Sequence, residues 1–202
     1  MQNPLAFQLR KVAEANFPTR FGIFRILGFE GEGIGRTDEA AVLVRGELSG
    51  DPPPLVRIHS QCLTGDVFHS LRCDCRAQLE LSLERIASED RGVILYELQE
   101  GRGIGLMNKL RAYELQDAGA DTVEANEQLG FEADLRNFNL PGEILRYLGL
   151  TRVRLLSNNP QKVQAVERAG VGVVERIPCI ADPHEWTEGY LEVKRRKLGH
   201  LL

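Results

Sequence analysis

The sequence predicts an α/β fold, a mixed β-sheet flanked by helices, in a single domain that spans residues 1–202. Alternating and β-branched runs mark six stretches as strands, and apolar residues at helical spacing fill the intervals between the later ones. Strands that alternate with helices are typical of mixed α/β folds. A chain of 202 residues with 43% hydrophobic and 27% charged residues is long enough for one sizeable core.

The elements follow in chain order. The predicted strands are residues 21–29, 41–46, 55–60, 92–98, 153–157 and 171–176. The apolar helical stripes are Leu79, Leu83 and Ile86, then Leu106, Leu110 and Tyr113, then Val163 and Val166. Residues 121–129 form a further short helical stretch. Residues 31–38 and the proline-rich run 51–54 are expected to be loops inside the domain, because the segments before them are too short to bury a core.

Three cysteines, Cys62, Cys73 and Cys75, follow the predicted strand at 55–60. Structural zinc normally has four protein ligands, whereas catalytic zinc has three and leaves a position for water, whose pKa then falls to roughly 7. Three thiolates are one fewer than a closed site requires. The cysteines therefore predict one catalytic Zn²⁺ per subunit.

Core thiols, disulfides and a closed metal site are the alternatives to a catalytic zinc. Free cysteines are often buried core residues, but here charged residues alternate with cysteines in the run 72–76, a poor setting for core thiols. Disulfides require an oxidising compartment, and residues 1–17 lack the apolar core of a signal peptide, which favours a cytoplasmic protein with reduced thiols. A closed site in which His59 or His69 supplies a fourth ligand stays open.

Charge and hydropathy exclude two classes of partner. A net charge of −4 argues against a general nucleic-acid binder, since such proteins present a basic surface to phosphates. No apolar run approaches the roughly 18 residues that suggest a membrane span. We interpret the basic run 194–197 as a solvated face without a function. Neither a nucleic-acid polymer nor a membrane is expected as a partner.

Two turns have the composition of anion-binding sites. The strand at 92–98 runs into a glycine-rich turn and then a helix, so that backbone amides could approach a phosphate. In the second turn, Asn159 is the expected N-cap, Pro160 the first helical residue and Gly170 the helix stop. Lys162 then lies in the first helical turn, where a cation is unfavourable by roughly 0.3–1 kcal/mol unless a phosphate lies beside it. A solvated lysine is the alternative.

Asp134 and Arg136 lie in a predicted loop at 130–141. Side chains two residues apart in an extended chain project to the same side, so this pair could form a surface salt bridge or act together on a ligand. Tyr113 shares its stripe with two leucines, which predicts a core tyrosine with its hydroxyl at the edge. Cations flank each glycine-rich or cysteine-bearing turn, and a polyphosphate substrate beside a hydrolytic zinc accounts for all of them: Arg57, Arg72, Arg76, Arg102, Arg136 and Lys162.

Four segments together resemble the GTP cyclohydrolase II family, in order and in spacing: RIHSQCLTGDVFHSLRCDCRAQLE, ELQEGRGIGLMNKLRAYELQDAGADTVEANEQLGF, ADLR and LLSNNPQKV. The resemblance covers nearly the whole chain. It implies a hydrolase that converts GTP to 2,5-diamino-6-(5-phosphoribosylamino)pyrimidin-4-one, formate and pyrophosphate, the first step of riboflavin biosynthesis. It also implies that zinc-activated water opens the guanine ring at carbon 8, that Mg²⁺ accompanies the triphosphate, and that the enzyme is a homodimer.

The resemblance assigns the site residues as well. The zinc ligands fall on the three cysteines, the proton acceptor on Asp134, the nucleophile that displaces pyrophosphate on Arg136, and a group needed for ring opening on Tyr113. The implied GTP-binding residues are Arg57, Ile58, His59, Ser60, Gln61, Gln78, Glu100, Gly101, Arg102, Thr122, Ser157 and Lys162. Because a guanidinium is a poor nucleophile, electrostatic stabilisation of charge on the α-phosphate is a rival role for Arg136.

The chain departs from the usual family pattern at Gln61, Arg76, Asn137 and Ser157, none of which is an implied zinc ligand or catalytic group. Gln61 stands where a glutamate is common, so a contact that relies on negative charge is lost there. Rival functions are a paralogue that acts on a purine nucleotide with incomplete hydrolysis, a non-catalytic zinc-containing nucleotide-binding regulator, and a purely structural metal domain. The regulator predicts a fourth protein ligand on zinc.

Overall fold

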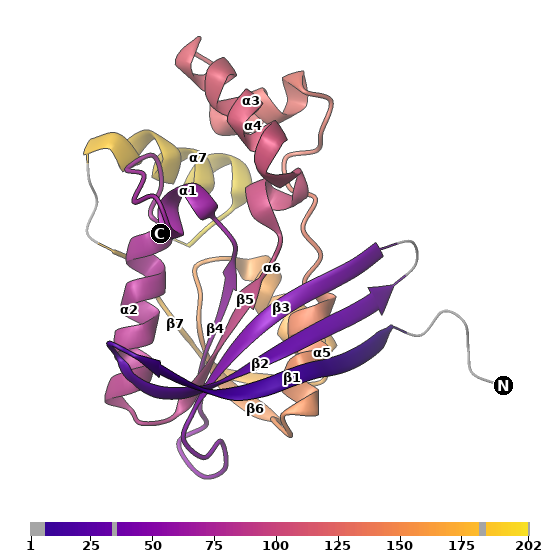
Figure 1. The fold of residues 1–202 in the computed structure, drawn as a ribbon. Coiled ribbons are helices and arrows are strands. Elements are labelled where there is room, and N and C mark those ends of the chain that lie inside the picture. The colour runs from indigo at the N-terminus through magenta and orange to yellow at the C-terminus, as the bar shows by residue number, and fades with distance from the viewer. Residues whose placement is uncertain (1–6, 34–35, 182–184, 202) are drawn as a thin grey trace, which may run out of the picture.

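One mixed sheet organises the chain. The computed structural model describes residues 7–33, 36–181 and 185–201, and in these residues seven strands join in the order β1-β2-β3-β5-β4-β6-β7 (Figure 1). Antiparallel pairing links β1 to β2, β2 to β3 and β3 to β5, and parallel pairing links β5 to β4, β4 to β6 and β6 to β7. The strands are β1 (Gln8–Thr19), β2 (Gly22–Gly33), β3 (Arg36–Arg45), β4 (Leu55–Ser60), β5 (Gly92–Glu97), β6 (Arg152–Leu156) and β7 (Gly172–Ile177). The predicted mixed α/β fold is confirmed.

Helices cover both faces of this sheet and one of its ends. The core beside α5 and α6 contains Val93 and Leu95, whereas the intervening Ile94 points to the core beside α2, as alternation along a strand requires. Helices α1, α3, α4 and α7 gather beyond the carboxyl ends of β4 and β5 (Figure 1). The helices are α1 (Leu63–Asp66), α2 (Cys75–Ser88), η1 (Glu100–Gly103), α3 (Gly105–Asp117), α4 (Thr122–Gln128), α5 (Asn139–Tyr147), α6 (Pro160–Arg168), η2 (Glu185–Thr187) and α7 (Glu188–Leu198).

The six predicted strands are all present, but the expected loop at 31–38 is wrong. Strand β2 continues to Gly33 and β3 begins at Arg36, with Gly31 paired to Asp38, so only the turn between them lies outside the described residues. The glycines and acidic residues of this run resemble a loop in composition, yet backbone pairing on both sides of β2 holds it extended. Strand β1 was not predicted because nearly all its side chains are exposed, which leaves no buried alternation to detect.

The helical predictions are mixed. The stripe on α2 is confirmed, with Ile86 buried and Leu79 and Leu83 packed beside it. The core stripe predicted on α3 is wrong, since Leu110 is 41% exposed and Ala112 is the residue that α3 buries. The predicted loop at 130–141 ends early because α5 begins at Asn139. No helix in the described part of the chain is both long and apolar enough to cross a membrane.

Candidate active site

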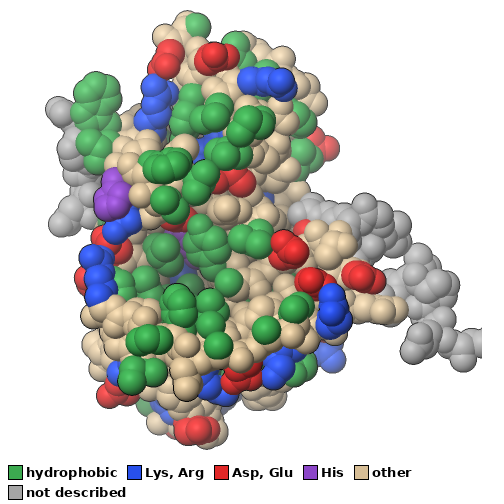
Figure 2. Space-filling model, viewed as in Figure 1, with side chains coloured by type: hydrophobic (Ala, Val, Ile, Leu, Met, Phe, Trp, Pro, Cys, Tyr) green, Lys and Arg blue, Asp and Glu red, His purple; other side chains and the backbone are tan. Residues whose placement is uncertain are grey.

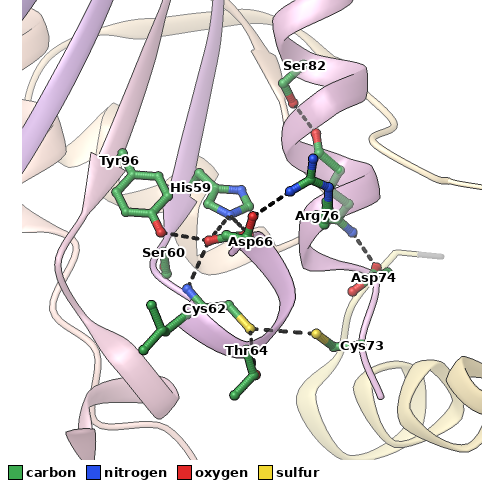
Figure 3. A network of polar contacts seen from close by, with 12 residues as sticks. His59, Ser60, Cys62, Thr64, Asp66, Cys73, Asp74, Arg76, Ser82 and Tyr96 are labelled. Atoms are coloured by element: carbon green, nitrogen blue, oxygen red, sulfur yellow. Dashed lines mark hydrogen bonds and ion pairs between the residues drawn. The ribbon is translucent and has the colours of Figure 1, made fainter. Parts of the chain in front are cut away.

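The three cysteines converge just beyond the carboxyl end of β4. Cys62 precedes α1, Cys75 is the first residue of α2, and all three Sγ atoms lie within 4.8 Å of one another. Figure 3 shows the Cys62 and Cys73 side chains pointing toward each other, and their Sγ atoms are 3.6 Å apart. Gly65 makes this approach possible, since a Cβ there would lie 2.9 Å from the Sγ of Cys73. All four cysteines of the chain are free thiols, so the disulfide alternative is wrong.

Hydrogen bonding makes Cys62 the most acidic of the cluster. The Cys73 and Cys75 thiols, together with the Lys109 ammonium 3.1 Å from the Cys62 Sγ, hold the pKa of Cys62 well below its usual value. The Cys62 sulfur in turn raises the pKa of Cys73 to about 11. One thiolate therefore forms readily, and a divalent cation would be needed to neutralise three. Closely spaced soft sulfur donors fit zinc.

Histidine does not complete this donor set in the residues that the structure describes. His59 places its Nε2 3.2 Å from Asp66 Oδ1 and stacks on Tyr96, with ring centroids 5.4 Å apart. His69 is exposed and stands outside the cysteine group. The closed-site alternative therefore finds no support in the described ranges, where three sulfurs form the cluster.

Asp66 anchors the loop that carries the first cysteine. Its Oδ2 accepts hydrogen bonds from the Cys62 backbone N–H (3.0 Å) and the Tyr96 hydroxyl (2.7 Å), and Figure 3 shows it between these groups and His59. Arg76 reinforces the turn by donating to the Asp66 carbonyl at 2.7 Å. The sequence gives no signal for this role, because Tyr96 and Arg76 lie 30 and 10 residues from Asp66 along the chain and only the fold brings them together.

A pocket opens beside the cysteines and brings together nearly all of the predicted site residues. Those that line it are Arg57, His59, Ser60, Gln61, Cys62, Cys73, Cys75, Gln78, Glu100, Gly101, Arg102, Tyr113, Thr122, Arg136, Ser157 and Lys162. Two do not. The Ile58 side chain is fully buried in the hydrophobic core, and Asp134 reaches the pocket only through its contact with Arg136. Lining residues that sequence reasoning missed include Lys109, Tyr190, Lys194 and His200.

Lys162 is a buried residue that lines this pocket. Asn159 caps α6 by accepting from Gln161 N–H, Pro160 is the first helical residue, and the Lys162 Nζ donates to the Ile58 carbonyl (2.9 Å) and the Ser60 hydroxyl (3.1 Å). The solvated alternative is wrong, since Lys162 is buried. Burial lowers the pKa of Lys162 well below its usual value. A buried ammonium without a carboxylate in hydrogen-bond contact is the kind of group that an anionic ligand would stabilise.

Arg136 and Asp134 form a largely buried pair, and not the surface pair that was the simpler expectation. The guanidinium donates to both carboxylate oxygens, at 2.8 and 2.5 Å, and their side chains are 11% and 14% exposed. Although burial opposes it, this contact keeps the pKa of Asp134 below its usual value and raises the pKa of Arg136 above its own. Asp134 is thus ionised and Arg136 protonated at neutral pH.

The glycine-rich turn presents a further cation. Gly101 and Arg102 in η1 both adopt left-handed backbone conformations, at φ 61° and 58°, which costs on the order of 1–2 kcal/mol for a residue with a Cβ. Among the described residues, both terminal nitrogens of Arg102 are buried without a hydrogen-bond partner. Strained backbone and an unpaired buried guanidinium together indicate a binding site for an anion.

The model of the GTP cyclohydrolase II family matches residues 10–178. The chain belongs to the GTP cyclohydrolase II family. Proteins named GTP cyclohydrolase-2 from Yersinia pestis and Escherichia coli are 55% and 54% identical to it over 195 residues, which are 96% of this chain and 98% of each relative. The resemblance inferred from four segments is confirmed, as is an enzyme of the GTP cyclohydrolase II type.

A solved structure was also matched. A two-domain 3,4-dihydroxy-2-butanone 4-phosphate synthase from A. baumannii aligns with 86% of this chain and 40% of its own chain, at 20% identity and a TM-score of 0.47.

In this GTP cyclohydrolase II chain, Tyr113 is not the core residue that its helical spacing predicted. It lines the pocket, and its hydroxyl is 3.0 Å from the Thr64 hydroxyl, two residues from Cys62. The Arg72 guanidinium lies over its ring, 4.9 Å from the centroid. The phenol is therefore next to the cysteine cluster, where sequence periodicity could not place it.

Proposed function

We propose that this GTP cyclohydrolase II family member hydrolyses GTP to 2,5-diamino-6-(5-phosphoribosylamino)pyrimidin-4-one, formate and pyrophosphate, and so begins riboflavin biosynthesis. The observation that carries the proposal is one pocket that joins a three-cysteine cluster to buried cations. Zinc on Cys62, Cys73 and Cys75 would supply a Lewis acid with an open position, able to lower the pKa of water to roughly 7.

The cations of the pocket are proposed to hold the triphosphate together with Mg²⁺. Arg102 offers two unpartnered nitrogens and Lys162 a buried ammonium, and a phosphate chain would supply acceptors to both. The Arg136 guanidinium is held in place because its Nε and Nη2 donate hydrogen bonds to the Asp134 carboxylate. Its third nitrogen, Nη1, lies 3.3 Å from the Ser60 hydroxyl. We therefore favour electrostatic stabilisation of the α-phosphate by a protonated Arg136 over attack by its nitrogen.

Proton transfer is assigned to two groups. Asp134, ionised beside Arg136, is the proposed proton acceptor, and Tyr113, hydrogen-bonded to Thr64, is proposed to move a proton during ring opening. Guanine and ribose contacts are proposed for the remaining assigned residues: Arg57, His59, Ser60, Gln61, Gln78, Glu100, Gly101, Thr122 and Ser157. Ile58 would contribute only its backbone, because its side chain is buried in the hydrophobic core.

We further propose a cytoplasmic homodimer. Large apolar side chains are exposed on several elements, including Ile23 (68%), Phe68 (70%) and Met107 (63%), and Figure 2 shows hydrophobic side chains gathered over the middle of one face. Apolar surface of this kind supports a protein contact. Four free thiols suit a reducing compartment.

Product analysis tests the proposed activity. Purified protein incubated with GTP, Zn²⁺ and Mg²⁺ should release formate and pyrophosphate in equal amounts, and Cys75→Ser should release no formate. Pyrophosphate without formate would overturn the complete reaction and favour the paralogue. GTP binding without either product would favour the nucleotide-binding regulator. A metal-free protein that unfolds would favour the structural domain, whereas the proposal predicts a folded, inactive one.

A further inference from the structure

The C-terminal helix forms part of the pocket wall, although no role was predicted for it. Tyr190, Lys194 and Leu198 lie four residues apart on α7, hence on one face, and all three line the pocket, as does His200 beyond the helix. Lys194 was expected to be solvated in the run 194–197, but it is only 8% exposed. The match to the family model ends at residue 178, before this helix.

Lys194 makes a buried ion pair with the residue between two cysteines of the cluster. Its Nζ lies 2.7 Å from Asp74 Oδ1, and the side chains are 10% and 9% exposed. The second oxygen of Asp74 accepts from the Gln78 amide at 2.5 Å, so the Gln78 carbonyl oxygen faces the other way and accepts from Arg57 at 2.6 Å. Asp74 therefore dictates which end of the Gln78 amide faces Arg57.

The chain after α7 is also anchored at the pocket. Gly199 reverses the chain at φ 65°, and the Leu201 N–H donates to the Asn158 carbonyl at 2.9 Å in the turn before α6. By contrast, Lys197 pairs on the exterior with Asp121 and, at 3.0 Å, with Glu124. The same helix thus has one inward and one outward lysine, which gives a matched pair for experiment.

We propose that α7 completes the substrate site and that Lys194 is a positioning residue for GTP, which acts through Asp74 to orient Gln78 and Arg57. This inference rests on the proposed function, because it assigns these groups to the GTP site. A role through Asp74 differs from mere attachment of the helix: it requires that Lys194 and Asp74 affect nucleotide binding as one unit.

The test compares zinc-loaded wild-type protein with Lys194→Met, Lys194→Arg, Asp74→Asn, the Lys194→Met/Asp74→Asn double variant and the control Lys197→Met. Lys194→Met should raise the KM for GTP on the order of 10-fold or more with a much smaller change in kcat, as expected when binding and not chemistry is lost. Lys194→Arg should restore most of the affinity, and Lys197→Met should stay within about twofold of wild type.

The double variant tests the route through Asp74. Its KM should match that of Lys194→Met alone, whereas multiplied effects of the two single changes would overturn the proposal. The double variant removes both charges of the buried pair and so leaves neither unpaired. It therefore replaces Lys194→Met in the experiment if the single variant fails to fold. In that case, a KM for the double variant within twofold of wild type would overturn the proposal.

A measurement without turnover separates this inference from the proposed activity. Trp186, the single tryptophan, lies in η2 directly before α7, so its fluorescence anisotropy reports on the order of that helix. Anisotropy should fall in Lys194→Met and remain at the wild-type value in Lys197→Met. Unchanged anisotropy in Lys194→Met would overturn the anchoring of α7 even if GTP were turned over. Wild-type protein that releases no formate would instead refute the proposed activity.

Discussion

Replacement of Lys162 by methionine should stabilise the protein while it weakens nucleotide binding. The Lys162 ammonium is buried and donates to the Ile58 carbonyl and the Ser60 hydroxyl, without a carboxylate among its hydrogen-bond partners. Loss of these two hydrogen bonds costs about 1–3 kcal/mol in total. Removal of a buried charge recovers several kcal/mol of desolvation, which Glu97 offsets only in part. The net expectation is a gain of roughly 1–3 kcal/mol near pH 7.

The pH dependence of this gain has a definite sign. Burial lowers the pKa of Lys162 in the folded protein, so the unfolded chain binds more protons in the interval between the folded pKa and about 10.4, and wild-type stability rises with pH there. Lys162→Met lacks the titrating ammonium, so its stability should not rise with pH in this interval. Its advantage over wild type should therefore be largest near neutral pH and shrink as the pH approaches 10.

Urea unfolding at pH 7, 8.5 and 10 measures this difference. Pyrophosphate, a product of the proposed reaction, should raise the unfolding midpoint of wild type and have a weaker effect on Lys162→Met, because bound anion stabilises the folded state in proportion to its affinity. The exposed Lys197→Met is the control and should show neither effect. A Lys162→Met protein that is less stable than wild type at pH 7, by an amount independent of pH, would refute this reasoning.

Three further changes have defined outcomes. Asp66→Asn should lower the free energy of unfolding, measured in urea, by about 2–3 kcal/mol. The reason is that an amide replaces the carboxylate that accepts hydrogen bonds from the Cys62 N–H and the Tyr96 hydroxyl. A loss under about 0.5 kcal/mol would contradict this prediction. Burial raises the pKa of Glu97 to about 7, so the wild-type free energy of unfolding should fall as pH rises from about 4.3 to 7. Glu97→Gln lacks this titration, so its stability relative to wild type should increase across that window. Identical dependence of the free energy of unfolding on pH in the two proteins would refute the prediction. Arg136→Lys should retain measurable pyrophosphate release if the side chain acts by its charge, whereas complete loss in a folded variant would support covalent catalysis.

The sequence was sufficient for elements with a buried pattern. The parallel strands β4 and β5 are buried along almost their whole length and rich in β-branched and other apolar residues, so their positions were predicted within a residue, and the cap of α6 was predicted from Asn159 and Pro160. Strand β1 escaped detection because almost all of its residues are exposed. Helix α7 was not predicted, because its inward face combines Tyr190 and Lys194 with Leu198 and so shows no apolar stripe in the sequence. That face packs on polar groups of the pocket.

The site was predicted as a set of residues but not as a network. Local residue patterns, and then the family resemblance, identified the three cysteines and the cations, because these lie in contiguous segments of the chain. The contacts that fix them join distant segments, as with Lys109 to Cys62 or Lys194 to Asp74, and no local pattern encodes a pair 47 or 120 residues apart. Such long-range pairs form only when the fold brings these segments together.

X-ray absorption at the zinc edge distinguishes the proposed open site, in which three thiolates hold the metal and one position is left for water, from a closed site with four protein ligands. Protein reconstituted with one equivalent of Zn²⁺ should show three sulfur neighbours and one light neighbour, and His59→Ala should leave this spectrum unchanged. A spectrum with four sulfurs, or a light neighbour that is lost in His59→Ala, would indicate a closed zinc site and rule out the proposed open position.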